Sequence, residues 1–288
     1  MLISGLWTQV KQIAPFWIAG LVAGSIVSVF LSEKIAEKVS HIGESNFWLL
    51  PICISSLLGI ISPLCMYGTI PVIVALGKKK TPQHILIAFM ISSVLLNPNL
   101  FLMSFALGTR LALIRLGLSF LCGVLAGIIV LFLFQNKGLF CYEQFILQGK
   151  KKKKTFFADL FKAFRITAPY LLFGITLTTL CDRYIPQEWI SSIFGSRRGL
   201  GVLFATTLSI PLYACGGGTI PLIKAWLQAG MGAGDALAFM IAGASLKINN
   251  LSAVKMIFST KHFFFYVGYC LSFAILSGLF IEYILKRL

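Results

Sequence analysis

A tetrapeptide motif occurs twice in this chain, 150 residues apart, and this duplication constrains the fold more than any other feature. Gly-Thr-Ile-Pro stands at 68–71 and again at 218–221. The same shift, without a gap, aligns Ala-Phe-Met-Ile at 88–91 with the identical tetrapeptide at 238–241. Matches of this kind at one offset rarely arise by chance. The sequence therefore predicts two internal repeats that share one order of structural elements.

The composition is that of a helical membrane protein. Of the 288 residues, 58% are hydrophobic and only 12% are charged, which is about half the charged share that is usual in soluble domains. Several apolar runs approach or exceed the roughly 20 residues that a helix needs to cross a bilayer. A transmembrane β-barrel would instead show short alternating segments. We therefore expect an all-α polytopic protein of the cytoplasmic membrane, with the lipid bilayer as its surroundings.

The apolar runs predict about eight transmembrane helices, four in each repeat. They cover approximately residues 13–31, 47–77, 83–108, 111–134, 166–181, 199–229, 236–258 and 262–285. This pattern divides the chain into a first membrane repeat (1–134), a lysine-rich connector (135–156) and a second membrane repeat (157–288). Gly, Pro and Asn residues predict that four helices are discontinuous, with breaks at 63–71, 97–99, 211–221 and 247–250.

The basic residues predict an orientation. A net charge of +16 suggests nucleic acid in a soluble protein, but in a membrane protein Lys and Arg collect in cytoplasmic loops, so no nucleic-acid partner is inferred. Placing the lysines at 150–154 in the cytoplasm also places 78–80 and the C-terminal Lys286 and Arg287 there, with both termini cytoplasmic. Four crossings per repeat, eight in all, make the repeats parallel, whereas re-entrant hairpins with an extra crossing in each repeat, ten in all, make them inverted. The sequence leaves both arrangements open.

The four breaks predict a central site. Non-helical backbone at membrane depth must line a cavity or be buried in protein. The glycine and proline of each Gly-Thr-Ile-Pro suit a turn followed by a half-helix. Thr69 and Thr219 would then lie at or just before the start of a half-helix. Free backbone amides at such a start favour an anionic or strongly polar group. Simple capping of a packed kink is the alternative. The candidate substrate-binding residues are Cys65, Gly68, Thr69, Pro71, Asn97, Asn99, Cys215, Gly218, Thr219, Pro221, Lys247, Asn249 and Asn250.

Three kinds of side chain at these breaks suggest chemistry. Lys247 can bind an anion or couple proton movement, since ionisable groups within spans usually face a cavity; pairing inside the bundle is the alternative. Cys65 and Cys215 are candidate soft ligands for a thiophilic metal or metalloid, with ordinary buried thiols as the alternative. The asparagines can instead satisfy the local backbone. Arg115, Lys224 and Lys255 are expected to reach the interface with their long stems. No resident cofactor is expected.

The paired motifs resemble a known family of transporters. Pro-Leu-Cys-x-x-Gly-x-Ile-Pro at 63–71, Ala-Phe-x-Ile-Ser-Ser-x-Leu-Leu-Asn-Pro at 88–98 and Pro-Leu-Tyr-x-x-Gly-Gly-x-Thr-Ile-Pro-Leu at 211–222 resemble the predicted permease family that includes the organoarsenical-efflux permeases. The resemblance implies a multi-pass permease, with efflux of organoarsenicals or soft metals in some members. Many members carry Cys-Ser-Cys-Gly in the first motif, and this chain keeps only Cys65 of that cysteine pair.

These features predict a permease that moves a small solute, as an efflux protein, with the site at the paired breaks. A thiophilic, organoarsenical-like solute is one candidate. A passive channel for a small anion or polar solute could use the same breaks. No Walker motif, His/Glu metal motif or Ser–Lys arrangement stands out in the sequence, so no enzyme is predicted. The sequence indicates no oligomeric state.

Overall fold

The computed structural model describes eleven helical elements in two groups. The described residues are 49–62, 64, 66–78, 81–134, 140, 157, 161, 164–165, 200–213 and 219–285. The first group comprises α3 (Leu49–Ile61), α4 (Met66–Lys78), α5 (Gln83–Leu95), α6 (Pro98–Ser104), the 3₁₀ turn η2 (Phe105–Leu107) and α7 (Thr109–Leu133). The second comprises α11 (Leu200–Leu212), α12 (Thr219–Gln228), α13 (Ala233–Leu246), α14 (Ile248–Ile257) and α15 (Thr260–Leu285). The predicted helices at 13–31 and 166–181, and nearly all of the connector, lie outside the described residues.

The two groups have the same helix order and the same packing. The starts of α5 and α13, at residues 83 and 233, are 150 positions apart, and those of α7 and α15, at 109 and 260, are 151 apart. In the first group α5 packs between α3 and α7, and in the second α13 packs between α11 and α15. Every residue from Ile85 to Leu95 of α5 is buried, as is every residue from Gly234 to Leu246 of α13. A helix that is apolar on all sides is expected at such a central position.

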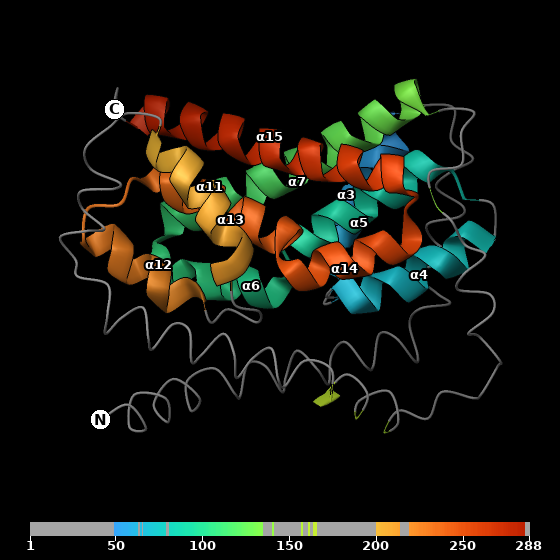
Figure 1. The fold of residues 1–288 in the computed structure, drawn as a ribbon, viewed down its shortest axis with the longest axis horizontal. Helices are drawn as coiled ribbons and strands as arrows, with labels where there is room; N and C mark the ends of the chain where they lie inside the picture. The colour runs from blue at the N-terminus through green and yellow to red at the C-terminus, as the bar shows by residue number, and fades with distance from the viewer. Residues whose placement is uncertain are drawn as a thin grey trace.

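The counterpart helices run in opposite directions. In Figure 1, α7 runs from the left side to the upper right, whereas α15 runs from the right side to the left and ends near the mark for the C-terminus. The half-helices α4 and α12 both begin toward the middle of the molecule and run outward, to the right and to the left respectively (Figure 1). The described parts of the two halves therefore face each other in an antiparallel arrangement.

Short helices of the two groups contact each other across the boundary. Helix α4 of the first group contacts α14 of the second, and α12 of the second contacts η2 of the first. The central helices α5 and α13 also contact each other. One hydrophobic core runs across this boundary, since it contains Ile73 and Leu86 together with Val254 and Ile257.

Two described helices are long and apolar enough to cross a membrane on their own. These are α7, with a mean hydropathy of 2.7, and the Thr260–Ile284 part of α15, with a mean hydropathy of 2.0. Gln83–Leu95 and Leu100–Leu107, which bend by 47° at the break, form a third candidate if the pair is one span. Helices α3, α11 and α13 are shorter and apolar. The fold of the described residues is all-helical apart from one isolated bridge between Phe140 and Phe258, and the total number of crossings, eight or ten, stays a prediction.

The first break is shorter in the structure than the sequence predicts. Helix α4 already begins at Met66, so Thr69 lies inside the helix and not at its start. Met66, Ile70 and Ile73 form a buried face at helical spacing, and burying this face favours an additional turn of helix. In the second half, the described part of α12 begins at Thr219.

The breaks near Pro98 and Lys247 are also short. Helix α5 ends at Leu95 and α6 begins at Pro98, while α13 ends at Leu246 and α14 begins at Ile248. The seventh helix begins earlier than predicted, because α13 starts at Ala233 and Asp235 lies in its first turn. Gly108, with φ at +112°, precedes α7 and allows the chain to turn sharply after η2 in a conformation that other residues rarely adopt.

Candidate functional site

The predicted asparagines act on the backbone at the breaks. Asn97 is the N-cap of α6, and its Oδ1 accepts a hydrogen bond from the Leu100 amide at 2.9 Å. Asn250 lies in the first turn of α14 and donates from Nδ2 to the Ala244 carbonyl at 2.5 Å. These contacts satisfy polar groups that the breaks leave without a helical partner. Both amides therefore support the break itself, which is the structural alternative that the sequence left open.

The two threonines of the repeated motif occupy different positions. Thr69 is fully buried, and its Oγ1 lies 3.1 Å from Ser93 Oγ. Ser93 in turn donates to the Met90 carbonyl on α5 at 3.0 Å, so Thr69 ties α4 to the central helix. Thr219 is 2% exposed and is the first residue of α12, where the sequence predicts it. Thr69 therefore lies within α4, whereas Thr219 is the first described residue of α12.

Lys247 lies at the junction of α13 and α14 and contacts an aromatic ring from another part of the chain. Its side chain is partly buried, and Nζ lies 5.8 Å from the centre of the Tyr213 ring, within the range of a cation–π interaction. Tyr213 directly follows α11. A Cβ on Gly243 would collide with the Tyr213 ring, so the missing side chain of Gly243 makes room for it. Lys247 is thus placed beside Tyr213 at the junction of α13 and α14, and its role in binding stays a prediction.

Arg115 contacts the hydroxyl end of Tyr213, and the expectation that it reaches the interface is wrong. It is only 1% exposed, so it does not extend to the surface. Its Nη1 donates to Ser104 Oγ at 2.7 Å, and its Nη2 donates to Tyr213 Oη at 3.4 Å. Arg115 is the sixth residue beyond Thr109, which places it about 9 Å into the apolar helix α7. An ionisable residue inside a span was the signal that could have identified it.

The remaining predicted residues are only partly placed. Cys65, Cys215 and Gly218 lie outside the described residues. Gly68 and Pro71 lie in α4, Asn99 lies in α6, Asn249 lies in α14, and Pro221 is exposed on α12. Within the described ranges, no group of three or more His, Cys, Asp and Glu residues could hold a metal ion. The cysteine-based hypothesis is therefore carried only by the sequence.

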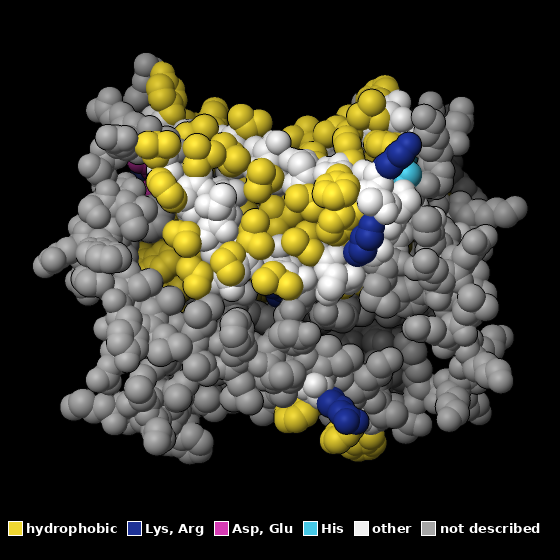
Figure 2. Space-filling model, viewed as in Figure 1, with side chains coloured by type: hydrophobic (Ala, Val, Ile, Leu, Met, Phe, Trp, Pro, Cys, Tyr) yellow, Lys and Arg dark blue, Asp and Glu magenta, His cyan; other side chains and the backbone are white. Residues whose placement is uncertain are grey.

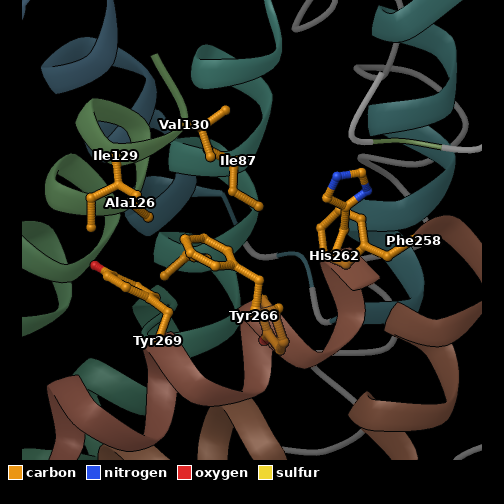
Figure 3. Close-up of a pocket in the computed structure, with 10 residues that line it drawn as sticks. Ile87, Ala126, Ile129, Val130, Phe258, His262, Tyr266 and Tyr269 are labelled. Atoms are coloured by element: carbon orange, nitrogen blue, oxygen red, sulfur yellow. The ribbon is translucent and has the colours of Figure 1, made fainter. Parts of the chain in front are cut away.

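A separate apolar hollow lies between α5, α7 and α15. Ile87, Ala126 and Ile129 line one side, and Tyr266 and Tyr269 line the other (Figure 3). The hydroxyls of both tyrosines are already used, because Tyr266 donates to the Ser245 carbonyl at 3.2 Å and Tyr269 donates to the Cys122 carbonyl at 2.6 Å. This hollow is lined mainly by apolar side chains, with His262 among them, and lacks the arginine and lysine found around Tyr213.

The outer surface fits a lipid environment. On the face shown in Figure 2, hydrophobic side chains extend over much of the described surface, and basic side chains stand out toward the end where α15 begins. Phe264, Leu276 and Phe280 of α15 are each more than half exposed, at 66%, 66% and 61%. Large exposed apolar surfaces are unusual on soluble monomers and are expected on spans that face lipid.

Comparison with known proteins gives three relatives of low identity. A protein of Streptococcus mutans, named as a putative subunit of a two-component membrane permease complex, is 26% identical over 271 residues, covering 88% of this chain and 86% of its own length. The UPF0718 protein YcgR of Bacillus subtilis is 24% identical over 282 residues, covering 93% and 92%. The UPF0718 protein MJ0584 of Methanocaldococcus jannaschii is 25% identical over 133 residues, covering 46% and 36%.

No solved structure matches the chain. The family model named ArsP_1, described as a predicted permease, matches residues 7–283 and so includes both copies of the Gly-Thr-Ile-Pro motif. The resemblance inferred from the paired motifs is therefore confirmed. The chain belongs to the ArsP_1 family of predicted permeases, and it is a membrane protein of the transporter class.

Proposed function

We propose that this permease carries a small solute along a path between its two halves, and that the breaks beside α4, α6, α12 and α14 line this path. The observation that carries the proposal is the contact between short helices of the two halves, α4 with α14 and α12 with η2. Discontinuous helices at the boundary between repeats form the substrate sites of many transporters. Movement of one half relative to the other would change these contacts, which is what alternating access requires.

The antiparallel course of α7 and α15 supports inverted repeats. These two helices are counterparts in the order of elements, and they run in opposite directions (Figure 1). The proposed units remain a first repeat at 1–134, a connector at 135–156 and a second repeat at 157–288. Inverted halves around a boundary site are one of the recurring arrangements of secondary transporters.

The same geometry changes the proposed orientation. Helix α4 ends at Lys78, α7 ends shortly before the lysine-rich connector, and α15 begins beside Lys261, all toward the right in Figure 1. The positive-inside rule favours the cytoplasm for this side. Helix α15 ends on the opposite side (Figure 1). We therefore propose that the connector is cytoplasmic and the C-terminus is not, whereas the lysine pattern by itself predicts that both termini are cytoplasmic.

Efflux of a thiophilic solute is a further part of the proposal, and it rests on the sequence. Cys65 and Cys215 occupy equivalent positions of the two repeats, and thiolates bind soft metals and metalloids. The relative from Streptococcus mutans is named as one subunit of a two-component complex, so a second membrane subunit is a proposed partner for this chain as well.

A transport assay with paired cysteine variants tests these proposals. Purified protein in proteoliposomes would be supplied with methylarsenite, Cu(I), Zn²⁺ and small anions, and accumulation would be compared for wild type, Cys65→Ser and Cys215→Ser. Cys53→Ser is the matched control, because Cys53 lies on α3, away from the breaks. We expect saturable transport of at least one solute. Loss in the two break variants alone would support a soft solute, and equal transport in all four proteins would exclude a role for the cysteines.

The same assay separates a permease from a channel. A carrier shows counterflow, in which unlabelled solute inside the vesicles drives the uptake of labelled solute, because the site faces one side at a time. A passive channel shows no counterflow. Transport that neither saturates nor shows counterflow would refute alternating access.

A further inference from the structure

Two cationic side chains converge on one tyrosine at the boundary of the halves. Arg115 comes from α7 in the first half, while Tyr213 follows α11 and Lys247 joins α13 to α14 in the second half. The Arg115 guanidinium reaches the hydroxyl of Tyr213, and the Lys247 ammonium lies over its ring. Two positive charges, one from α7 and one from the α13–α14 junction, therefore lie beside the same tyrosine side chain.

Arg115 has no carboxylate partner in the described part of the chain. Its hydrogen bonds are made to two neutral hydroxyls, those of Ser104 and Tyr213. The two described carboxylates lie elsewhere: Asp235 lies beside Gly201, and Glu282 accepts a hydrogen bond from the Gly234 amide at 3.2 Å. A buried charge without a counter-charge is destabilising. The protein keeps this cation at 1% exposure inside an apolar helix, which is a functional signal in a membrane protein.

The geometry points to a site, formed by Arg115, Tyr213 and Lys247, that binds one small oxyanion. This inference rests on the proposed function, because the anion would be the transported solute or its charged group. A guanidinium has five N–H donors and binds carboxylate, sulfate or phosphate oxygens through two of them at once. The Tyr213 hydroxyl can turn to donate to the same oxygen, and Lys247 supplies a second charge.

The site also offers a reason for coupling between the halves. Ser104, at the end of α6, holds Nη1 of Arg115 and donates its own hydroxyl proton to the Leu100 carbonyl at 2.6 Å. Arg115 is therefore positioned by the first half, and Tyr213 and Lys247 by the second. An anion held between them would favour the arrangement in which the halves are close, and its release would remove that preference. Differential binding of this kind shifts a conformational equilibrium.

Direct binding to the purified full-length chain tests the site without transport. Sodium sulfate, sodium phosphate and sodium acetate would be titrated at constant ionic strength, and binding would be measured by calorimetry and by thermal stabilisation. The variants are Lys247→Gln and Tyr213→Phe, since Lys247 is partly exposed and Phe keeps the ring. Arg110→Gln is the matched control, because Arg110 is on the same helix as Arg115 but is exposed. Arg115→Lys adds a variant that keeps the charge but loses the paired donors.

We expect saturable binding of at least one of these anions to wild type. Lys247→Gln should weaken binding about tenfold or more, because it removes one of two charges, and Tyr213→Phe should weaken it less. Arg110→Gln should bind as wild type does. Absence of saturable binding for all three anions, or equal affinity for Lys247→Gln and Arg110→Gln, would overturn the proposal. Anion binding without transport in proteoliposomes would refute only the permease mechanism, and transport of another solute without anion binding would refute only this site.

Discussion

Replacement of Gly123 by alanine should destabilise the first half, because α7 contacts α5 and α3 at this residue. A Cβ at this position would collide with Ser92 Oγ, and it would also lie 2.8 Å from Ser56 Oγ and 3.0 Å from the Ala88 carbonyl oxygen. The two serines share a hydrogen bond of 2.7 Å that links α3 to α5. The Ser92 hydroxyl would have to rotate away, so both the packing and this hydrogen bond would change.

The expected loss in the free energy of unfolding follows from the changed packing and the changed hydrogen bond. Overpacking of a close-packed interface costs about 1–3 kcal/mol, and loss of a buried hydrogen bond adds about 1 kcal/mol. Replacing glycine in a helix by alanine returns up to about 1 kcal/mol, so we expect a net loss of about 1–3 kcal/mol in the free energy of unfolding. Gly117→Ala on the same helix is the control, because a Cβ at Gly117 would have no neighbouring atom within 4 Å, and it should be neutral or slightly stabilising.

The assay is unfolding of the purified protein in detergent, followed by tryptophan fluorescence, for both variants and for a double-mutant cycle. Ser92→Ala removes the colliding hydroxyl, so Gly123→Ala should cost less in that background than in wild type, with a coupling of about 1 kcal/mol. Equal stability of the Gly123→Ala and Gly117→Ala proteins would show that α7 does not approach α5 as closely as described. Strict additivity of Gly123→Ala and Ser92→Ala would refute the collision with the hydroxyl.

Two further predictions concern the centre and the orientation. Gly243→Ala should displace the Tyr213 ring and weaken anion binding several-fold, because a Cβ there would meet the ring. Gly268→Ala is the control and should bind as wild type does, because a Cβ at Gly268 would meet no atom within 4 Å. Unchanged binding in both variants would contradict the described packing. Fusion of a topology reporter should place the connector near 150–154 in the cytoplasm and the C-terminus on the other side, and finding both on one side would refute the inverted arrangement.

The long spans could be predicted from the sequence because continuous apolar runs and their boundaries determine them. The predicted helices at 111–134 and 262–285 agree with α7 and α15 within two residues at each end. The break at Pro98 also follows from local chemistry, since proline lacks the amide that a continuous helix needs. Such features depend on a few neighbouring residues and on the length that a bilayer requires.

The neighbours of a residue across the fold could not be predicted in the same way. Arg115 sits about one and a half turns into an apolar helix, and its distance from the helix end is compatible with a stem that extends to the interface. The structure buries it because α6 and the residue after α11 supply hydroxyls on that face of α7. The start of α4 likewise depends on the buried face of Met66 and Ile70, which tertiary packing determines. The direction of the second half relative to the first is also a long-range property.

The antiparallel course of α7 and α15 limits how such a chain could have arisen. Two copies of one half inserted in the same orientation would place the counterparts of α7 and α15 parallel. Under the inverted arrangement that we propose, a precursor consisting of one half would have inserted in both orientations and paired with an inverted copy. Orientation in the membrane follows the distribution of Lys and Arg between the loops on its two sides. Such a precursor therefore needed nearly equal numbers of Lys and Arg in the loops on both sides. A run of lysines such as 150–154 becomes compatible with the fold only once fusion has given each half its own fixed orientation.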